Sequence, residues 1–436
     1  MTNITVIGLG KSGFSTLNYL LRHYSYNTIK VIDTRQHVPN LDAVPDNIEV
    51  HTGSFKQEWL NSSDLIIVSP GVDIRQAEFT QAQEKGAEVI GDVEFFAQEL
   101  LKKDKYPNII SITGSNGKST VTTLCYEVLK ANGINVSLGG NIGVPVLDVI
   151  DNNFDAYVLE LSSFQLETLK SLKPISAVHL NLSQDHLDRY DSYDHYNLAK
   201  HNVFNNAKLA IFNQQDEFTD PKNHFNKVSF GTDNSEYLIK DIDNASHLFF
   251  KDELLLTEDE IKLVGQHNLL NILSVFALTS PLNLNKKITK KAICEFAGLP
   301  HRCQLAYENN GVKWINDSKA TNVGSLVACL DGLKVKGKLH LLLGGDGKGA
   351  DFKSLTPLFK NFDIQLYCFG KDKESLAELD RSSLVFDTMS QTMQKAAEDL
   401  NSGDIVLLSP ACASIDQFKN FEVRGEEFIK LAKQLG

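Results

Sequence analysis

The segment at residues 113–120 constrains the fold more than any other part of this chain. It reads Thr-Gly-Ser-Asn-Gly-Lys-Ser-Thr, follows an apolar run at residues 109–112, and precedes a stretch with helical periodicity. A strand, a glycine-containing loop and a helix in this order are typical of nucleotide-phosphate binding, because backbone N–H groups and the helix dipole face the anion. The loop is shorter than the common G-x-x-x-x-G-K-[ST] form. The competing interpretation is a turn that contains a lysine by chance.

This loop predicts a site for a nucleoside triphosphate. The ammonium of Lys118 would contact phosphate oxygens, and the hydroxyl of Ser119 would reach Mg²⁺. The residues predicted to hold the phosphates are Gly114, Ser115, Asn116, Gly117, Lys118, Ser119 and Thr120.

Composition limits the classes of partner. The 436 residues carry a formal net charge of -12, which argues against broad attraction to nucleic acid or to an anionic membrane. No apolar run approaches the roughly 20 residues that a membrane-spanning helix needs. The six cysteines are scattered singly, without a C-x-x-C pair, which favours reduced thiols and no zinc site. We therefore expect a soluble cytoplasmic monomer that acts on small molecules.

The alternation of β-branched runs with helical stretches predicts three consecutive α/β domains. We expect a Rossmann-like domain at residues 1–93, a central ATP-binding P-loop domain at 94–298, and a Rossmann-like C-terminal domain at 299–436. The predicted strands lie at residues 4–7, 29–32, 64–69, 88–90, 109–112, 156–160, 177–181, 209–213, 312–315, 339–343, 365–369 and 405–408.

Residues 8–13 satisfy G-x-G-x-x-G directly after the first predicted strand, and Asp33 closes the second. Alone, this pattern suggests a nicotinamide dehydrogenase. However, too little chain precedes the phosphate loop for the six-stranded sheet that holds a whole dinucleotide. A nucleoside-diphosphate sugar fits such a turn equally well, with Asp33, Thr34 and Arg35 as polar neighbours. A purely structural turn stays open as an alternative.

Polar residues at other strand ends are further candidates. Glu160 ends an apolar strand, where a carboxylate is costly to bury unless it is paired or binds a metal, so it is a candidate Mg²⁺ ligand. Its neighbours Ser162 and Ser163 suggest a helix cap instead, and both interpretations are compatible. The loop at residues 181–190 combines imidazole, carboxylate and guanidinium groups, which indicates either a functional site or a charged surface turn. The loops at residues 316–322 and 343–349 indicate either anion binding or solvated turns.

Taken together, these motifs resemble the Mur ligases, the ATP-dependent amino-acid-adding enzymes of bacterial peptidoglycan precursor synthesis. Residues 114–120 match the loop that the family shares. The D-glutamate-adding branch is indicated by residues 159–165, 317–324 and 409–414. Related folate polyglutamate synthases share the phosphate loop but lack an N-terminal module like residues 1–93.

The resemblance implies roles for particular residues. UDP-N-acetylmuramoyl-L-alanine would be held by Ser12, Asp33, Thr34, Arg35, Gly71 and Asn141, and ATP by the phosphate loop with Asn271, Arg302 and Asp317. The D-glutamate pocket would contain Thr321, Lys348, Ser414 and Phe421. Mg²⁺ would be held by Ser119, Glu160, His186 and Lys200, and the expected catalytic residues are Lys118, Glu160, His186, Lys200 and Lys319. The resemblance also implies that Lys200 is carbamylated, although a plain surface lysine on a helix is the alternative.

The implied reaction has two steps. The substrate carboxylate takes the γ-phosphoryl group of ATP to give an acyl phosphate, and the amine of D-glutamate then displaces phosphate to form an amide. Two other classes remain open from the sequence: a P-loop kinase or GTPase-type switch, and a non-catalytic sensor of nucleotide or UDP-sugar.

Overall fold

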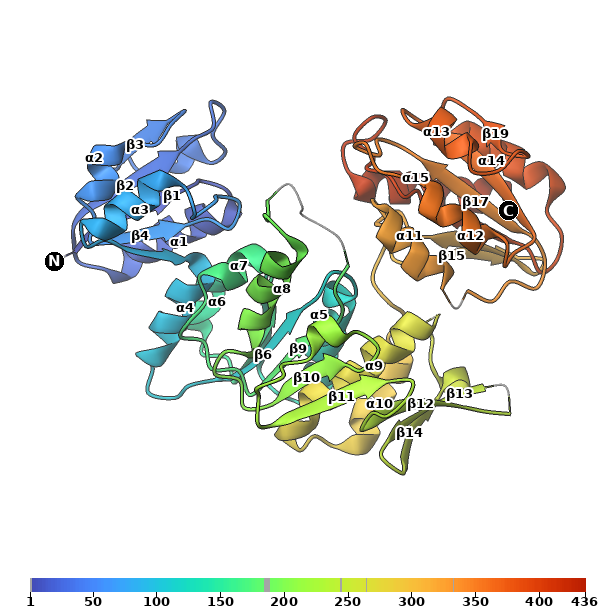
Figure 1. Cartoon of the computed structure of the whole chain (residues 1–436), viewed down its shortest axis with the longest axis horizontal. Coiled ribbons are helices and arrows are strands. Elements are labelled where there is room, and N and C mark those ends of the chain that lie inside the picture. Colours follow the sequence, from blue (N-terminus) through green and yellow to red (C-terminus); the bar gives the residue numbers. More distant parts are fainter. Residues whose placement is uncertain (1, 184–188, 244, 264, 332) are drawn as a thin grey trace. The chain divides into compact units, whose positions relative to one another are not determined.

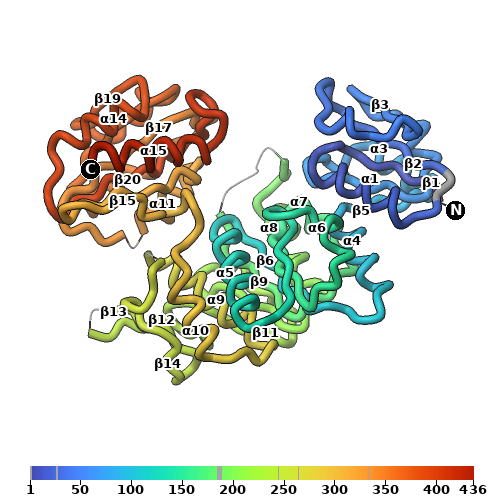
Figure 2. The backbone as a smooth tube through the Cα atoms, turned by 180° about the vertical axis from the view of Figure 1, so that it is seen from behind, coloured from blue at the N-terminus to red at the C-terminus, as the bar shows by residue number. Residues whose placement is uncertain are grey.

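The computed structural model describes residues 2–183, 189–243, 245–263, 265–331 and 333–436 (Figure 1). Packing divides the chain into two compact units. The first contains Met1–Lys240, Leu248–Leu255 and Ile272–Ala292, and the second contains Asp241–His247, Leu256–Asn271 and Ile293–Gly436. Figure 2 follows the same chain from behind as a tube. No helix among the described residues has the length and apolar character needed to cross a membrane.

The N-terminal sheet has five parallel strands in the order β3-β2-β1-β4-β5. Its strands are β1 (Thr2–Ile7), β2 (Tyr26–Asp33), β3 (Glu49–Thr52), β4 (Leu65–Val68) and β5 (Glu88–Gly91), and its helices are α1 (Lys11–His23), α2 (Gln57–Asn61), α3 (Ala77–Glu84) and α4 (Asp92–Leu101). The sequence did not predict β3, because this edge strand is largely exposed and lacks an apolar run. The strand order changes direction between β1 and β4, which is where open α/β sheets bind ligands.

The central sheet has nine strands in the order β14-β13-β12-β11-β10-β9-β6-β8-β7. Its strands are β6 (Asn108–Thr113), β7 (Val136–Gly140), β8 (Ala156–Glu160), β9 (Ser176–His179), β10 (Ala210–Asn213), β11 (Lys227–Gly231), β12 (Tyr237–Ile242), β13 (Ala245–Phe250) and β14 (Glu253–Thr257), and its helices are α5 (Lys118–Ala131), α6 (Val146–Val149), α7 (Ser163–Glu167), α8 (Tyr193–His201), α9 (Gln266–Thr279) and α10 (Lys286–Glu295). Strand β6 lies between β8 and β9, so the loop that follows β6 is flanked by the ends of two parallel strands.

The third sheet has six strands in the order β15-β16-β20-β17-β18-β19. Its strands are β15 (Gln304–Asn309), β16 (Val312–Asn316), β17 (Leu339–Gly344), β18 (Ile364–Phe369), β19 (Leu384–Val385) and β20 (Ile405–Leu408), and its helices are α11 (Val323–Leu330), α12 (Thr356–Phe359), α13 (Lys373–Ala377), α14 (Met389–Ala396) and α15 (Phe421–Leu435). Strand β15 runs antiparallel to β16 and was not predicted, because it is an edge strand without a buried residue.

The predicted fold class is confirmed: three α/β sheets follow one another along the chain, and the middle one carries the phosphate loop. The strands predicted with continuous apolar runs are all present. Among the missed strands, β3 and β15 have no buried residue, whereas β7 and β11 are partly buried but lack a continuous apolar run. The predicted domain boundaries stay predictions.

Candidate active site

The phosphate loop connects β6 directly to α5, which begins at Lys118. Gly114 and Gly117 have φ angles of 155° and 82°, a region that favours glycine. The ammonium of Lys118 folds back over the loop, with its Nζ 2.8 Å from the carbonyl oxygen of Gly114 and 2.9 Å from that of Ser115. The N-terminal N–H groups of α5 and this ammonium form a compact cationic end, which suits an anionic ligand.

Residues 181–183 brace the phosphate loop from the end of β9. The Asn181 side chain accepts from the backbone N–H of Asn116 at 2.8 Å and donates to the carbonyl oxygen of the same residue at 3.1 Å. The backbone N–H of Ser183 donates to Ser115 Oγ at 2.9 Å. Asn181 and Ser183, at the start of the predicted polar loop, therefore support the phosphate loop. His186, the predicted metal ligand in it, lies outside the described residues.

Glu160 occupies the end of β8, paired in register with Ile112 of β6. Its side chain is 1% exposed. One carboxylate oxygen accepts from Asn141 Nδ2 at 2.7 Å, and the other has no hydrogen-bond partner among the described residues. A buried carboxylate oxygen without a partner is costly, and a cation would relieve that cost. The residues at this position therefore fit a Mg²⁺ ion.

The helix-cap alternative for this segment is confirmed. Ser162 caps α7, and its side chain forms a reciprocal capping box with Gln165. The cap fixes the turn that follows Glu160, so the helix cap and the carboxylate belong to one local structure.

Lys200 lies on α8 and is only 2% exposed. Its Nζ is 2.9 Å from the carbonyl oxygen of Gly114 and 4.8 Å from the ring centroid of Tyr196. The surface-lysine alternative is therefore wrong, because the amine is buried against the phosphate loop. Whether it is carbamylated stays a prediction.

Sequence reasoning missed His179, which ends β9 opposite Thr113 of β6. The imidazole is fully buried, and burial together with the positive charge of Lys200 holds its pKa well below the usual value. It is therefore a neutral group beside the phosphate loop. The sequence pattern that could have identified His179 is the one that identified Glu160, namely a polar residue at the end of an apolar strand.

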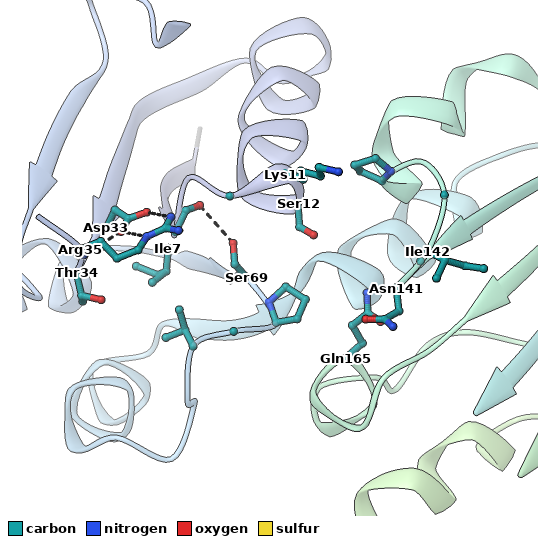
Figure 3. Close-up of a pocket in the computed structure, with 18 residues that line it drawn as sticks. Ile7, Lys11, Ser12, Asp33, Thr34, Arg35, Ser69, Asn141, Ile142 and Gln165 are labelled. Atoms are coloured by element: carbon teal, nitrogen blue, oxygen red, sulfur yellow. Dashed lines mark hydrogen bonds and ion pairs between the residues drawn. The ribbon is translucent and has the colours of Figure 1, made fainter. Parts of the chain in front are cut away.

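A cavity of about 690 Å³ lies at the carboxyl edge of the N-terminal sheet. All six residues predicted to hold the UDP-sugar line it: Ser12, Asp33, Thr34, Arg35, Gly71 and Asn141. In Figure 3, Asn141 and Gln165 face the cavity from the central domain, opposite Asp33 and Arg35. The third glycine of the G-x-G-x-x-G motif is required for close packing, since a Cβ at Gly13 would lie 1.7 Å from the carbonyl oxygen of Gly8.

Asp33 is held as a carboxylate in this cavity. Burial would raise its pKa, but the Arg35 side chain and the backbone N–H groups of Leu9 and Arg35 donate to it and lower the pKa to about 2. Arg35 and the Leu9 amide therefore lock the end of β2 to the glycine-rich turn after β1.

We expect the Asp33→Asn substitution to destabilise the protein near neutral pH. The folded-state pKa of Asp33 lies below its ordinary value of 3.8, so its contribution is complete above that value and is lost as the pH falls toward about 2. The difference in urea midpoint between wild type and variant should therefore shrink as the pH falls from about 4 toward about 2. Asp42→Asn, at an exposed position, is the control. A difference that does not change with pH would contradict the assigned role.

In the third sheet, three adjacent parallel strands end in the loops that carry the predicted D-glutamate residues. Lys319 follows β16, and its Nζ lies 4.1 Å from the ring centroid of Phe421. The loop of Lys348 after β17 pairs with the loop of Ser414 after β20 through two backbone hydrogen bonds between Asp346 and Ala413, each 2.9 Å. The structure thus gathers these segments at one edge of the sheet.

A buried arginine, which the sequence analysis did not single out, ties these three loops together. Arg424 on α15 is fully buried and donates to Ser318 Oγ at 3.0 Å and to the carbonyl oxygens of Ser318 and Cys412 at 2.8 and 3.1 Å. It also donates to the carbonyl oxygen of Gly344 at 3.4 Å. Burial lowers its pKa to about 10, which still leaves it charged at neutral pH. The strand ends are therefore fixed by one guanidinium.

Asn271, Arg302 and Asp317, which were predicted to complete the nucleotide site, belong to the second compact unit. Asp317 is buried and accepts from Ser409 Oγ at 2.7 Å and from the backbone N–H of Cys303 at 3.2 Å. Burial raises its pKa to about 6 despite these bonds. Their joint role with the phosphate loop stays a prediction.

The chain has the architecture of a phosphate-loop enzyme of three domains. It contains three consecutive α/β sheets, with a phosphate loop at the centre of the middle sheet and cationic loops at the strand ends of the third sheet. Family models match the chain as "Mur ligase MurD-like, N-terminal domain" at residues 2–91, "Mur ligase middle domain" at 112–279 and "Mur ligase, glutamate ligase domain" at 301–412. The chain belongs to the Mur ligase family, as the sequence motifs predicted.

Curated relatives resemble the chain over nearly its whole length. A UDP-N-acetylmuramoylalanine--D-glutamate ligase of Haemophilus influenzae is 49% identical over 99% of this chain and 98% of its own length. Enzymes with the same name from Mannheimia succiniciproducens and Vibrio campbellii are 48% and 45% identical, each over 99% of this chain and 97% and 98% of their own lengths.

Solved structures share the fold at low sequence identity. MurF ligase from Thermotoga maritima, solved in complex with ADP, has a TM-score of 0.63 at 19% identity, covering 99% of this chain and 94% of its own. UDP-N-acetylmuramate-alanine ligase MurC from the same organism has a TM-score of 0.59 at 17% identity and full coverage of both chains.

Proposed function

We propose that this protein is an ATP-dependent ligase that adds D-glutamate to UDP-N-acetylmuramoyl-L-alanine through an acyl phosphate, in cytoplasmic synthesis of peptidoglycan precursors. One geometric observation supports this function above the others. Asn141 lines the cavity of the N-terminal sheet and also donates to Glu160 beside the phosphate loop at 2.7 Å. A substrate held in that cavity by its UDP group would extend its free carboxylate toward the phosphates of ATP.

The first step is governed by charge. A carboxylate and the γ-phosphate repel each other, so cationic groups must offset that repulsion before an in-line attack can occur. Lys118 and the N-terminus of α5 supply positive charge at the loop. Mg²⁺, held by Ser119, Glu160, His186 and Lys200, would supply the rest when bound.

The second step uses the C-terminal domain. The amine of D-glutamate attacks the acyl phosphate, and phosphate leaves as the tetrahedral oxyanion collapses to the amide. D-glutamate carries two carboxylates, which suit the ammonium groups of Lys319 and Lys348 and the hydroxyls of Thr321 and Ser414. Arg424 would keep the loops that carry these groups in place.

Lys200 is proposed to act as a carbamate. Addition of CO₂ to its neutral amine forms an N–C bond and releases a proton, which turns a cation into an anionic oxygen ligand. A buried position against the Gly114 carbonyl oxygen of the phosphate loop suits an oxygen ligand that would help to hold Mg²⁺. We further propose that the protein is a monomer, with domain boundaries near residues 93 and 298.

The function is tested by labelling the substrate carboxylate with ¹⁸O and analysing the released inorganic phosphate. An acyl phosphate transfers one labelled oxygen to phosphate, because the C–O bond of the acid breaks in the second step. Phosphate that carries no label while ligated product accumulates would contradict the mechanism.

ADP release should require ATP, Mg²⁺, UDP-N-acetylmuramoyl-L-alanine and D-glutamate together, and L-glutamate is the matched control. ADP release without an amino acid would favour a kinase or switch, and binding without turnover would favour a sensor.

A further inference from the structure

Two cysteines that are 26 positions apart meet beside Asp317. Cys303 precedes β15, and Cys329 lies on α11 in the core of the third sheet. Their sulfur atoms are 3.1 Å apart. The ligand atoms of these two thiols and of the Asp317 carboxylate all lie within 4.8 Å of one another. In the part of the chain that the structure describes, this is the one group of three or more His, Cys, Asp or Glu side chains brought so close.

The spacing of the six cysteines led to an expectation of reduced thiols and no zinc site. That expectation rested on the absence of C-x-x-C spacing, but strand β16 and helix α11 fold residues 303 and 329 against each other. Two soft sulfur donors and one carboxylate are a ligand set that suits a thiophilic divalent cation such as Zn²⁺.

The sulfur separation favours a shared cation over a disulfide. Two thiolates on a tetrahedral zinc ion, with Zn–S bonds of about 2.3 Å, lie about 3.8 Å apart. A disulfide requires about 2.05 Å. The observed 3.1 Å is therefore nearer to the geometry of shared coordination, and the thiols must move apart by about 0.7 Å to reach it.

One oxygen lone pair of Asp317 would pass from a thiol to the cation. The Cys329 thiol hydrogen-bonds to this carboxylate, and a metal ion that replaces the thiol proton would take over that lone pair. The carboxylate also accepts from the Cys303 N–H at 3.2 Å and from Ser409 Oγ at 2.7 Å. These two bonds hold the carboxylate in place, as partners of metal-binding carboxylates commonly do.

A route for an ion is also present. Cys303 lines a cavity of about 880 Å³ within the second compact unit, together with Asn268 and Arg302. Cys329 and Asp317 are buried, and their ligand atoms lie within 4.8 Å of the Cys303 sulfur. An ion could reach the two sulfur atoms from this side and keep a water molecule as its fourth ligand.

We propose that Cys303, Cys329 and Asp317 form a binding site for Zn²⁺ or a chemically similar divalent cation. Binding releases the two thiol protons to solvent and forms two metal–sulfur bonds and one metal–oxygen bond, with no change in oxidation state. Insofar as the proposed nucleotide role of Asp317 holds, an occupied site would also weaken ATP binding.

The site is tested with the full-length reduced chain under anaerobic conditions. Cd²⁺ is titrated, and the thiolate-to-cadmium charge-transfer absorbance is recorded. We expect a band that saturates at one ion per chain and that Zn²⁺ displaces. Cys329→Ala should weaken Cd²⁺ binding by at least about 100-fold. Cys368→Ala is the matched control, because Cys368 is also buried in the core of the third sheet and lies outside the cluster. The Cys368→Ala variant should bind Cd²⁺ with the affinity of the wild type.

A second measurement does not depend on a variant that folds. Zn²⁺ should protect Cys303 and Cys329 of the wild-type chain from iodoacetamide, as read by peptide mass spectrometry. Equal Cd²⁺ affinity in the two variants, or alkylation that Zn²⁺ does not slow, would overturn the proposal. Formation of a Cys303–Cys329 disulfide in air, with no cadmium band in the reduced chain, would overturn it as well. None of these readouts depends on ligase activity, so the proposed function can fail or hold independently.

Discussion

Lys118→Ala should lower the turnover number for ligation by about 1,000-fold or more, which is the typical effect of removing a charge that stabilises phosphoryl transfer. The ammonium is attached to the first residue of α5 and lies over the loop, within 2.9 Å of two of its carbonyl oxygens. Without it, the phosphates of ATP would face the substrate carboxylate with less of their charge neutralised. Coupled ADP release at saturating ATP and UDP-sugar substrate measures the effect.

Lys130→Ala is the control for this substitution. Lys130 lies in the last turn of the same helix and is exposed, so its removal changes the net charge equally without touching the loop. Its turnover number should stay within a factor of about two of the wild type, since exposed charges contribute little. A Lys118→Ala protein that folds and ligates at a similar rate would refute the role of the phosphate loop in catalysis. It would favour a non-catalytic sensor.

Lys200→Ala should reduce the turnover number by about 100-fold or more, and short carboxylates should restore part of the loss. Removal of the proposed carbamate would take away an anionic oxygen ligand beside the phosphate loop. Added acetate or formate can occupy the vacated space and supply a carboxylate oxygen. Rescue should be partial, on the order of 10-fold, because a free anion lacks the effective concentration of an attached group. The readout is turnover as a function of acetate concentration.

The contact between Lys200 Nζ and the Gly114 carbonyl offers a competing explanation, in which a cationic amine simply supports the loop. Methylammonium distinguishes a supporting amine from a carbamate, because this cation can replace a missing ammonium group but cannot replace an anionic carbamate. Rescue by methylammonium and not by acetate would contradict carbamylation. Lys208→Ala, at an exposed position after α8, should neither lose activity nor respond to either ion. A thermal unfolding midpoint equal to that of the wild type would establish that the Lys200→Ala chain is folded.

The sequence was most informative where chemistry and apolar runs coincide. The loop at residues 113–120 and Glu160 were found because each terminates a continuous buried strand, and such a run identifies both the element and its carboxyl end. Edge strands such as β3 and β15 escaped notice, because exposed strands need no apolar pattern. His179 was overlooked although it closes a buried strand in the same manner as Glu160.

By itself, the sequence determined the class of fold, the phosphate loop and the family, because these depend on local order along the chain: strand, glycine turn, helix. Only the tertiary structure decided which distant residues meet. It buried Lys200 against Gly114, aimed the guanidinium of Arg424 at three strand-end loops, and brought Cys303 and Cys329 to within 3.1 Å of each other. Such contacts depend on strand order and helix packing, and the spacing of residues along a chain does not encode them in any simple way.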